Sequence, residues 1–355
     1  MARTVVLKLK TKQFDTLTRS LTPPVMPASL EEFSNIALSL RERVDLGPGQ
    51  LFRLVGVGLS NFQVDAESTA PLFEEIASRE VAAVLASNEC TYVHKEAREE
   101  VIKIASWNVN SIRARAEHVK AWLGTNQPDV LLLQELKGTE FPSAWFQEQG
   151  YDSVSVTQKT YNGVAILSRS PVETVSTTLL GDEADSHARF LEVIIENIRI
   201  VNIYLPNGNP VGTAKFDYKL SWMDRLAKQM KLWLKSDVPT VVGGDFNVIP
   251  EDIDCHKPAS WIRDALFQPE PRARYRALLD LGYVDAFRSL HPDESGQFTF
   301  WDYFRQAFEH NRGIRIDHFL LSPALADRLV SCEIDRGPRA QLRPSDHTPI
   351  IVELR

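Results

Sequence analysis

Beyond residue 100, the apolar residues of the chain gather in short runs that are separated by longer helical or polar segments. A run of strand length that is apolar throughout is typical of a strand buried on both faces. Two neighbouring runs, 189–196 and 198–205, are joined by a connection too short for a crossover, so we predict that they are antiparallel. The predicted strands are 102–109, 129–135, 162–168, 189–196, 198–205, 239–247, 314–322 and 347–354, and the predicted helices are 114–125 and 215–235. This alternation predicts an α/β fold: a four-layer sandwich of two mixed β-sheets, back to back and flanked by helices.

The first 62 residues follow a different pattern. Residues 3–11 alternate apolar and polar positions with period two, as a half-buried strand does, and 14–22 is the predicted hairpin partner. Residues 28–44 have helical periodicity, and 51–62 is predicted as a further strand. A small N-terminal α+β fragment with the order β-β-α-β is therefore predicted.

Residues 63–100 separate the two patterns. All seven tryptophans lie after this stretch, and residues 65–100 carry nine acidic and three basic side chains. Residues 71–86 place apolar side chains on one side of a helix. We predict an acidic, partly helical linker over 63–100, between a small unit over 1–62 and a larger domain over 101–355.

Composition narrows the classes of function. The chain has 355 residues and a formal net charge of -7, so a nucleic-acid partner has to be held by local basic patches. The three cysteines show no metal or disulfide spacing, which is typical of a protein from a reducing compartment. The sequence contains neither a secretory signal nor an apolar run long enough to span a bilayer, so we expect a cytoplasmic protein with no membrane partner.

Short polar clusters end the apolar runs of the larger domain. Asp245 and Asn247 end one such run, and in extended backbone they would face one cavity because residues two apart point to the same side. On this stretch alone, a strand end followed by a turn is the favoured explanation, since Gly, Asp and Asn dominate turns. The six clusters are WNVN (107–110), QE (134–135), YLPN (204–207), GDFN (244–247), RID (315–317) and SDH (345–347). Each has a structural alternative, such as a turn, a helix cap or an exposed charge pair, but six in one domain predict a site at one rim of the sheets.

The residue types in these clusters indicate a hydrolytic metal site. The hard oxygen ligands, which suit Mg²⁺ and not zinc, are Asn108, Glu135 and Asp346. Asp317 can orient and stabilise a charged His347, and Asp245 is a candidate base for a water. The candidate donors to a phosphate oxygen are Asn247, His347 and Tyr204. The set predicts metal-assisted phosphodiester hydrolysis without a covalent enzyme intermediate. No Walker A or G-x-S-x-G motif in the sequence supports an NTPase or a serine hydrolase.

With these residues identified, residues 102–355 resemble the exonuclease III family of abasic-site endonucleases, within the endonuclease/exonuclease/phosphatase superfamily. The matching stretches are IKIASWNVNSIRAR, LLLQELK, YNGVAILSR, NIYLPNGNP, KLSWMDRL, GGDFNVIPEDIDCHKPASW, TFWDYF, NRGIRIDHFLLS and PSDHTPI. The resemblance implies a DNase I-like fold and a Mg²⁺-dependent nuclease, with Mn²⁺ as a substitute ion, that cuts 5′ to abasic sites and degrades DNA from 3′ to 5′. It also implies a monomer that acts on double-stranded DNA with abasic sites or 3′ ends, and that is nucleoid-associated when bound to DNA.

The resemblance further implies a role for each site residue. Asn108 and Glu135 hold the metal with Asp346 beside it. The full candidate ligand set is Asn108, Glu135, Asp245, Asn247 and Asp346. The candidate catalytic residues are Tyr204 at the phosphate, Asp245 activating the water, Asn247 stabilising the transition state, and Asp317 paired with His347.

Other branches of this fold are the competing assignments. They include phospholipid and inositol-phosphate phosphatases and DNase I-like nucleases, in which the strand end at 204–207 typically carries a histidine. Tyr204 and Asn207 match the abasic-site branch instead. In that branch an aromatic and an aliphatic residue shape a pocket for a base-less sugar, and by position these are Phe300 and Ile316. The candidate substrate-binding residues are Asn207, Phe300, Trp301, Ile314 and Ile316, with core packing as an equal alternative for Trp301.

Residues 2–62 resemble the end of the little-finger domain of Y-family polymerases of the DNA polymerase IV type. The matching stretches are ARTVVLKLK, FDTLTRSLT and FRLVGVGLSNF. The palm with its catalytic carboxylates is absent from the sequence, so no polymerase activity is expected. Lys12, Thr18 and Arg19 are candidate phosphate contacts, and a fused remnant with no role is the alternative. The stretch APLFEE (70–75) is weakly similar to peptides that bind a sliding clamp. For the whole chain, the alternative to an enzyme is a DNA-binding accessory protein with little or no catalysis.

Overall fold

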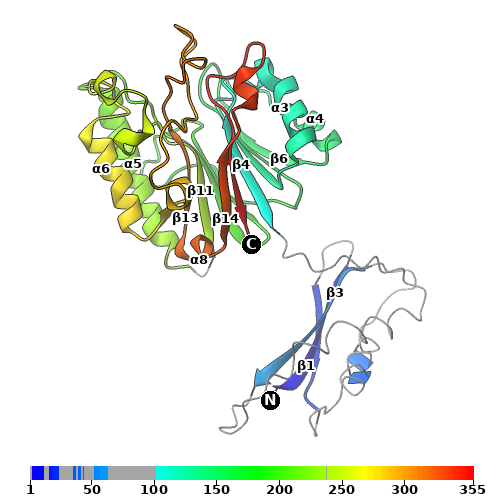
Figure 1. Cartoon of the computed structure of the whole chain (residues 1–355). Helices are drawn as coiled ribbons and strands as arrows, with labels where there is room; N and C mark the ends of the chain where they lie inside the picture. Colours follow the sequence, from blue (N-terminus) through cyan, green and yellow to red (C-terminus); the bar gives the residue numbers. More distant parts are fainter. Residues whose placement is uncertain are drawn as a thin grey trace. The chain divides into compact units, whose positions relative to one another are not determined.

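Figure 1 shows the computed structural model of the chain, which describes residues 2–11, 16–23, 35–36, 39–40, 43, 52–62, 101–236 and 238–355. The chain divides into two compact units, Met1–Glu96 and Ala97–Arg355, and each is described by itself. The predicted linker over 63–100, with its helix over 71–86 and the clamp-like stretch 70–75, lies outside the described residues. Within the predicted helix 28–44, residues 35–36 and 39–40 are described as helical.

The N-terminal unit contains a three-stranded antiparallel sheet. In the order β2-β1-β3, the strands are β2 (Thr16–Leu21), β1 (Ala2–Thr11) and β3 (Phe52–Phe62). The hairpin register pairs Val5 with Leu21, and Val5 is buried. The three predicted strands and the hairpin pairing of the first two are confirmed.

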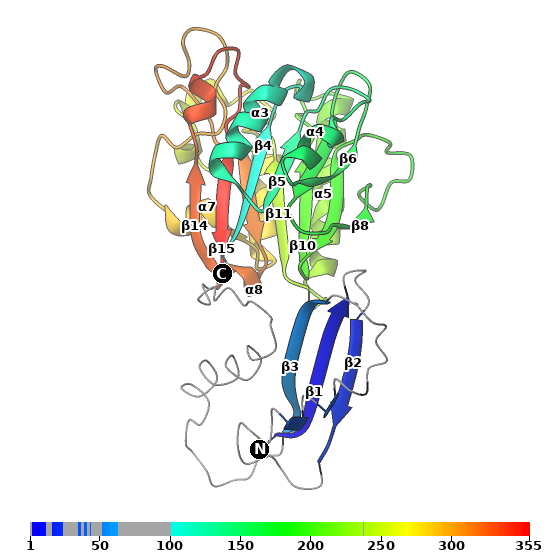
Figure 2. The ribbon, with the colours of Figure 1, turned by 90° about the vertical axis from the view of Figure 1, so that its right-hand side faces the viewer.

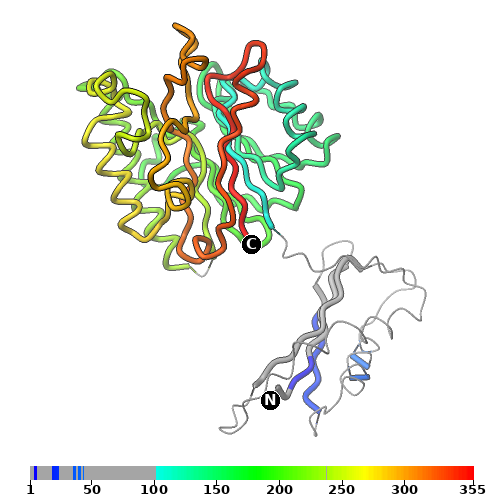
Figure 3. Tube along the Cα trace, in the orientation of Figure 1, coloured from blue at the N-terminus to red at the C-terminus, as the bar shows by residue number. Residues whose placement is uncertain are grey.

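The larger unit is built on two mixed six-stranded sheets. The first sheet has the order β14 (Leu329–Ile334), β15 (Ile350–Leu354), β4 (Ile102–Asn108), β5 (Val130–Gln134), β7 (Val164–Ser168) and β6 (Asp152–Val156). The second has the order β12 (Val284–Asp285), β13 (Asp317–Leu321), β11 (Thr240–Asp245), β10 (Ile198–Tyr204), β9 (Phe190–Ile195) and β8 (Glu173–Ser176). The β4–β5 and β10–β11 pairs are parallel and the others are antiparallel, including β9–β10 as predicted. The tube in Figure 3 shows how the C-terminal β15 lies beside β4, although the two are far apart in sequence.

Helices cover the outer faces of both sheets. In Figure 1, α5 (Ala214–Trp233) and α6 (Pro269–Asp280) lie outside the second sheet, and α3 (Ile112–Asn126) and α4 (Ser143–Glu148) lie outside the first. Figure 2 shows α3 and α4 in front of the first sheet. The connections contain α7 (Ala286–Leu290), α8 (Pro323–Ala326) and the 3-10 turns η1 (Asp252–Asp254), η2 (Pro258–Ser260) and η3 (Gly337–Ala340). The four-layer α/β sandwich confirms the predicted fold class. No described helix combines the length and the apolar character needed to cross a lipid bilayer.

Three apolar clusters separate the four layers. In β5, Leu132 faces the cluster between the two sheets, whereas Leu131 and Leu133 face the cluster under α3. In β10 of the second sheet, Ile200 lies in the cluster between the two sheets. Its neighbour Val201 points to the other face and packs with Trp222 of α5. Because both faces of these central strands are buried, their sequences are apolar throughout and do not alternate.

Candidate active site

The polar ends of the central strands meet at one end of the two sheets. Asn108 ends β4, Tyr204 ends β10 and Asp245 ends β11, while Glu135 directly follows β5. Asp317 begins β13, which is antiparallel to β11 and pairs Asp317 directly with Asp245. Parallel neighbouring strands end at the same edge of a sheet, and an antiparallel neighbour begins at that edge. The directions of the strands therefore explain why these polar residues lie close together.

The stretch GGDFN at the end of β11 forms a turn and also contributes residues to this group of polar strand ends. Gly244 has a φ of +141°, and a Cβ on it would lie 2.0 Å from the main-chain oxygen of Ile203, so the close approach to β10 requires glycine. The Asn247 main-chain N–H donates to Asp245 Oδ1 at 2.9 Å, and its φ of 47° lies in the left-handed region that Asn tolerates. The turn is therefore present, and it leaves Asp245 Oδ2 directed at Asn108.

Asn108 and Tyr204 connect the two sheets at Glu135. Asn108 Nδ2 donates to Glu135 Oε1 at 2.9 Å and to Asp245 Oδ2 at 2.9 Å. Tyr204 donates its hydroxyl to Glu135 Oε1 at 3.0 Å. Burial alone would raise the pKa of Glu135, but the Lys137 ammonium 2.7 Å from Oε2 and the bond from Asn108 lower it, so this carboxylate is ionised at neutral pH.

His347 is held between two carboxylates. Its Nδ1 lies 2.8 Å from Asp317 Oδ2, and its Nε2 lies 3.7 Å from Asp245 Oδ2. Burial alone would lower the pKa of His347, but the charges of Asp317 and Asp245 raise it to about 10, so the imidazole is protonated. Burial raises the pKa of Asp245 to about 7, and the charge on His347 opposes that rise. The two residues predicted to pair, Asp317 and His347, thus lie in hydrogen-bond contact.

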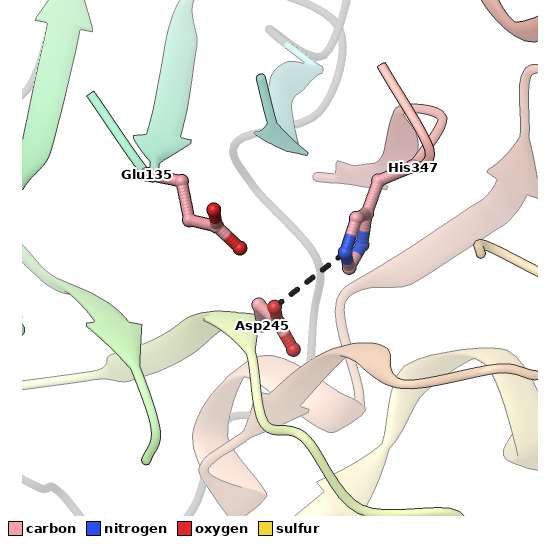
Figure 4. A group of neighbouring side chains, drawn as sticks. All are labelled: Glu135, Asp245 and His347. Carbon is pink, nitrogen blue, oxygen red and sulfur yellow. Dashed lines mark ion pairs between the residues drawn. The ribbon is translucent and has the colours of Figure 1, made fainter. Parts of the chain in front are cut away.

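The donor groups in this cluster fit a hard divalent cation. Ligand atoms of Glu135, Asp245 and His347 lie within 4.8 Å of one another, and Figure 4 shows the three side chains pointing toward one another. The two carboxylates are the oxygen donors that Mg²⁺ prefers. His347 is not an available ligand while both ring nitrogens carry protons. The carboxylates of Glu135 and Asp245 are therefore the groups of this cluster that are best suited to hold a cation.

Asp346 joins the cluster through Asn110. Asn110 Nδ2 donates to Asp346 Oδ1 at 3.0 Å, and the Asn110 main-chain N–H donates to Asn108 Oδ1 at 3.0 Å. Lys137 Nζ donates to Asn110 Oδ1 at 2.6 Å in addition to its contact with Glu135. Neither Asn110 nor Lys137 was among the predicted site residues. Asn110 and Lys137 each stand two positions after a predicted ligand, but their positive φ angles interrupt the alternation of a strand, so spacing alone does not predict these contacts.

The predicted pocket residues divide into two groups. The Phe300 ring packs edge-on against His347, with centroids 5.1 Å apart and an interplanar angle of 69°. Partly buried Phe300 shares one apolar cluster with the buried Ile314 and Ile316. Trp301 is fully buried in a separate cluster, and its indole N–H donates to Asn311 Oδ1 at 3.2 Å. Phe300 therefore lies at the site, and the burial of Trp301 supports its core-packing alternative.

Two cations that were not predicted lie beside the site. The Arg189 guanidinium lies 4.7 Å above the centre of the Tyr204 ring, and its Nη1 donates to the Tyr204 main-chain oxygen at 3.1 Å. Lys219, on α5, is fully buried and donates from Nζ to the main-chain oxygens of Asn207 and Asn247. Burial lowers the pKa of Lys219 to about 7, and the charge of Asp245 opposes that shift. In the sequence, both look like the many solvated cations of the chain, so no local pattern distinguishes them.

Both parts of the chain are similar to known proteins. Residues 105–347 match the Endonuclease/Exonuclease/phosphatase family, and residues 1–72 match the impB/mucB/samB family C-terminal domain. The second match confirms the resemblance of the N-terminal segment to Y-family polymerases. Exodeoxyribonuclease III of Haemophilus influenzae is 33% identical over 267 residues, which cover 72% of this chain and 100% of that protein.

Solved structures give the same picture for the larger unit. An AP endonuclease from Archaeoglobus fulgidus is 39% identical with a TM-score of 0.68, over 71% of this chain and 99% of that one. A 3′ phosphatase from Neisseria, bound to a product DNA hairpin, is 38% identical with a TM-score of 0.69, over 72% of this chain and 99% of that one. At this identity and coverage, the likeness extends to the whole larger unit.

Proposed function

Because the chain belongs to the endonuclease/exonuclease/phosphatase family, we propose that it is a DNA repair nuclease that hydrolyses the phosphodiester bond 5′ to abasic sites and degrades DNA from 3′ ends. The observation that carries the proposal is one hydrogen-bonded cluster, in which Asn108 and Tyr204 converge on Glu135 beside Asp245 and His347. The similarity to an exodeoxyribonuclease and to an AP endonuclease supports DNA as the substrate.

We assign a Mg²⁺ site, with Mn²⁺ as a substitute ion, to Asn108 and Glu135, with Asp346 beside them. When bound, such an ion supplies positive charge to a phosphate oxygen and lowers the pKa of a bound water. The ionised state of Glu135 supports this assignment, because the carboxylate needs no proton removed before it binds a cation. Asp245 and Asn247 complete the set from the second sheet.

The remaining residues act on the water and the phosphate. Asp245 takes the proton of the attacking water, because it is the buried carboxylate at the centre of the cluster. Asn247 and Tyr204 donate to phosphate oxygens, and protonated His347 stabilises the charge that develops on them. Water attacks phosphorus directly, and the bond to the leaving 3′ oxygen breaks without a covalent bond to the protein.

The rival to this proposal is a DNA-binding accessory protein that does not cut. The test is incubation of the full-length chain with a duplex that contains one abasic analogue, with Mg²⁺ and with EDTA. Incision only in Mg²⁺, with an intact duplex of the same sequence uncut at that position, supports the nuclease. Binding to the abasic duplex without incision in Mg²⁺ or Mn²⁺ would favour the accessory protein.

Removal of 3′ phosphates from DNA is a second candidate function. It is favoured by the 38% identity with the Neisseria protein, whose structure carries the name 3′ phosphatase. The same cluster serves both reactions, because a phosphate monoester at a 3′ end presents the same phosphorus to the water. A primer with a 3′-phosphate, compared with a 3′-hydroxyl primer, separates phosphate release from exonucleolytic degradation.

Replacing Phe300 with alanine should weaken the preference for abasic DNA. The partly buried ring lies against His347, where it is placed to exclude a normal nucleotide and to admit a base-less sugar. We expect the ratio of abasic to intact cleavage to fall about 10-fold, since pocket shape commonly supplies about 1–3 kcal/mol of discrimination. Phe308→Ala, in the Trp301 cluster, is the matched control. An unchanged ratio in a folded Phe300→Ala protein would assign Phe300 to the core.

Deleting the N-terminal unit should leave the chemistry intact and change only DNA binding. The whole of the Haemophilus exodeoxyribonuclease III aligns with 72% of this chain over 267 residues. That relative therefore has no counterpart of the N-terminal unit. The first twenty residues carry five basic and one acidic side chains, and Thr18 and Arg19 are exposed, whereas Lys12 lies outside the described residues. We predict that the slope of log K against log salt becomes shallower by about one to two, at about 0.9 per phosphate contact. The measurement compares the full chain with residues 97–355 across a salt series. Identical slopes would show that the N-terminal unit makes no phosphate contacts.

A further inference from the structure

Lys219 is a buried cation that has no part in the chemistry described above. Its side chain is fully buried on α5, and it forms no ion pair with any described residue. Burying an amine is costly unless its protons are hydrogen-bonded. Here the partners are two main-chain oxygens: that of Asn207, 3.0 Å from Nζ, and that of Asn247, 2.6 Å from Nζ. These oxygens belong to the segments that follow β10 and β11 into the site.

The turn after β10 leaves room for the Lys219 side chain. Gly208 has a φ of +87°, and a Cβ on it would lie 2.6 Å from Lys219 Cδ and 3.2 Å from Lys219 Cβ. Any other residue at this position would therefore require the Lys219 side chain or the turn to shift. The glycine in the stretch PNGNP is explained by this approach as well as by its own backbone conformation.

The same two segments are also joined through their side chains. Asn207 Nδ2 donates to Asn247 Oδ1 at 3.2 Å, and Asn247 Nδ2 donates to the Leu205 main-chain oxygen at 2.9 Å. Lys219 therefore joins the two main chains, and the paired amides join the two side chains. These contacts fix Asn247 in a turn where its φ of 47° is left-handed, a conformation that Asn adopts more readily than most other residues.

We propose that Lys219 is a positioning residue, which fixes the main chain of Asn207 and Asn247 so that the Asn247 amide is held ready to contact the scissile phosphate. The inference rests on the proposed function, because it takes Asn247 as a phosphate donor. Lys219 does not touch the phosphate itself. Its removal should lower the rate through Asn247 and leave DNA binding by the rest of the surface unchanged.

The test is a double-mutant cycle on abasic-site cleavage. In the wild-type background, Lys219→Met should lower kcat about 10-fold to 100-fold, because small misplacements of a catalytic group cost this much. KM should stay within about 3-fold of wild type. In the Asn247→Ala background, the same substitution should cost less than about 3-fold, because the residue through which it acts is gone. Lys228→Met, which replaces an exposed lysine of the same helix, is the matched control and should retain wild-type kcat.

A second readout does not depend on cleavage. Inorganic phosphate, as a stand-in for the substrate phosphate, should raise the Tm of the wild-type chain by mass action, and should raise that of Lys219→Met much less. If the wild-type chain gains this stabilisation but does not cut abasic DNA, only the proposed function fails. Equal costs of Lys219→Met in the two backgrounds, or an undiminished phosphate effect, would overturn the inference.

If Lys219→Met does not fold, Lys219→Gln, which keeps a donor amide, enters the same cycle. Failure of both to fold would make Lys219 a structural residue and would also overturn it.

Discussion

Asp245→Asn is expected to lower the rate of abasic-site cleavage about 10³-fold, within the range that a positioned general base contributes, while DNA affinity stays near wild type. The substitution keeps the size of the side chain and one acceptor oxygen, which can accept from Asn108 or from the Asn247 main-chain N–H, so one of these two hydrogen bonds is lost. It removes the carboxylate that takes the proton from water. It also removes one of the two charges that hold His347 protonated, although Asp317 remains at 2.8 Å.

The matched control is Asp252→Asn. Asp252 carries the same side chain on η1, where it forms an exposed ion pair with Arg272. Single-turnover cleavage of a duplex with one abasic analogue, together with a binding titration, separates chemistry from affinity. Cleavage by Asp245→Asn at the wild-type rate would remove Asp245 from the role of base.

Glu135→Gln should give the second large effect, and this effect should depend on the metal concentration. The substitution keeps the bonds that Asn108 and Tyr204 form with the Oε1 position but removes the negative charge. At limiting Mg²⁺ we expect a loss of about 100-fold or more, because even residues that only hydrogen-bond to the ligands of a metal typically contribute about 10–100-fold. Raised Mg²⁺ should recover part of the rate if binding of the ion is the main defect.

A metal titration of the rate provides the measurement, with Glu148→Gln as the control. Glu148 is an exposed glutamate at the end of α4 and takes no part in the cluster. A Glu135→Gln protein with unchanged turnover at limiting Mg²⁺ would show that Glu135 is not at the metal.

The hydrophobic pattern predicted every central strand of the two sheets and missed the four edge strands. The missed strands are β6, β8, β12 and β14, each of which stands at the end of its sheet. An edge strand is paired on one side only, and every residue of β6 and β8 is partly buried or exposed. Their sequences, DSVSV and ETVS, therefore lack the continuous apolar run that marks a strand covered on both faces.

The site was predictable where it follows from the order of residues along a strand. Asn108, Tyr204 and Asp245 end their strands in sequence and in space, and chain direction brings them together. The sequence does not reveal the partners of a side chain that extends from a helix to the neighbouring sheet. Lys219 meets Asn207 and Asn247 because α5 packs on the second sheet, and nothing near position 219 indicates it. Trp301 shows the reverse case, since the motif TFWDYF places it next to Phe300 but its ring packs into a separate cluster.

The central claim is that water, activated by this cluster and a divalent cation, breaks the bond 5′ to an abasic site. The most direct measurement is the chemistry of the product ends after one turnover in ¹⁸O-labelled water, with Mg²⁺ and with EDTA. Hydrolysis by the route described here predicts a 3′-hydroxyl on one fragment and a 5′-phosphate on the abasic residue, with one ¹⁸O in that phosphate and no reaction in EDTA. A 3′ unsaturated aldehyde without ¹⁸O in the phosphate, or incision that continues in EDTA, would contradict it.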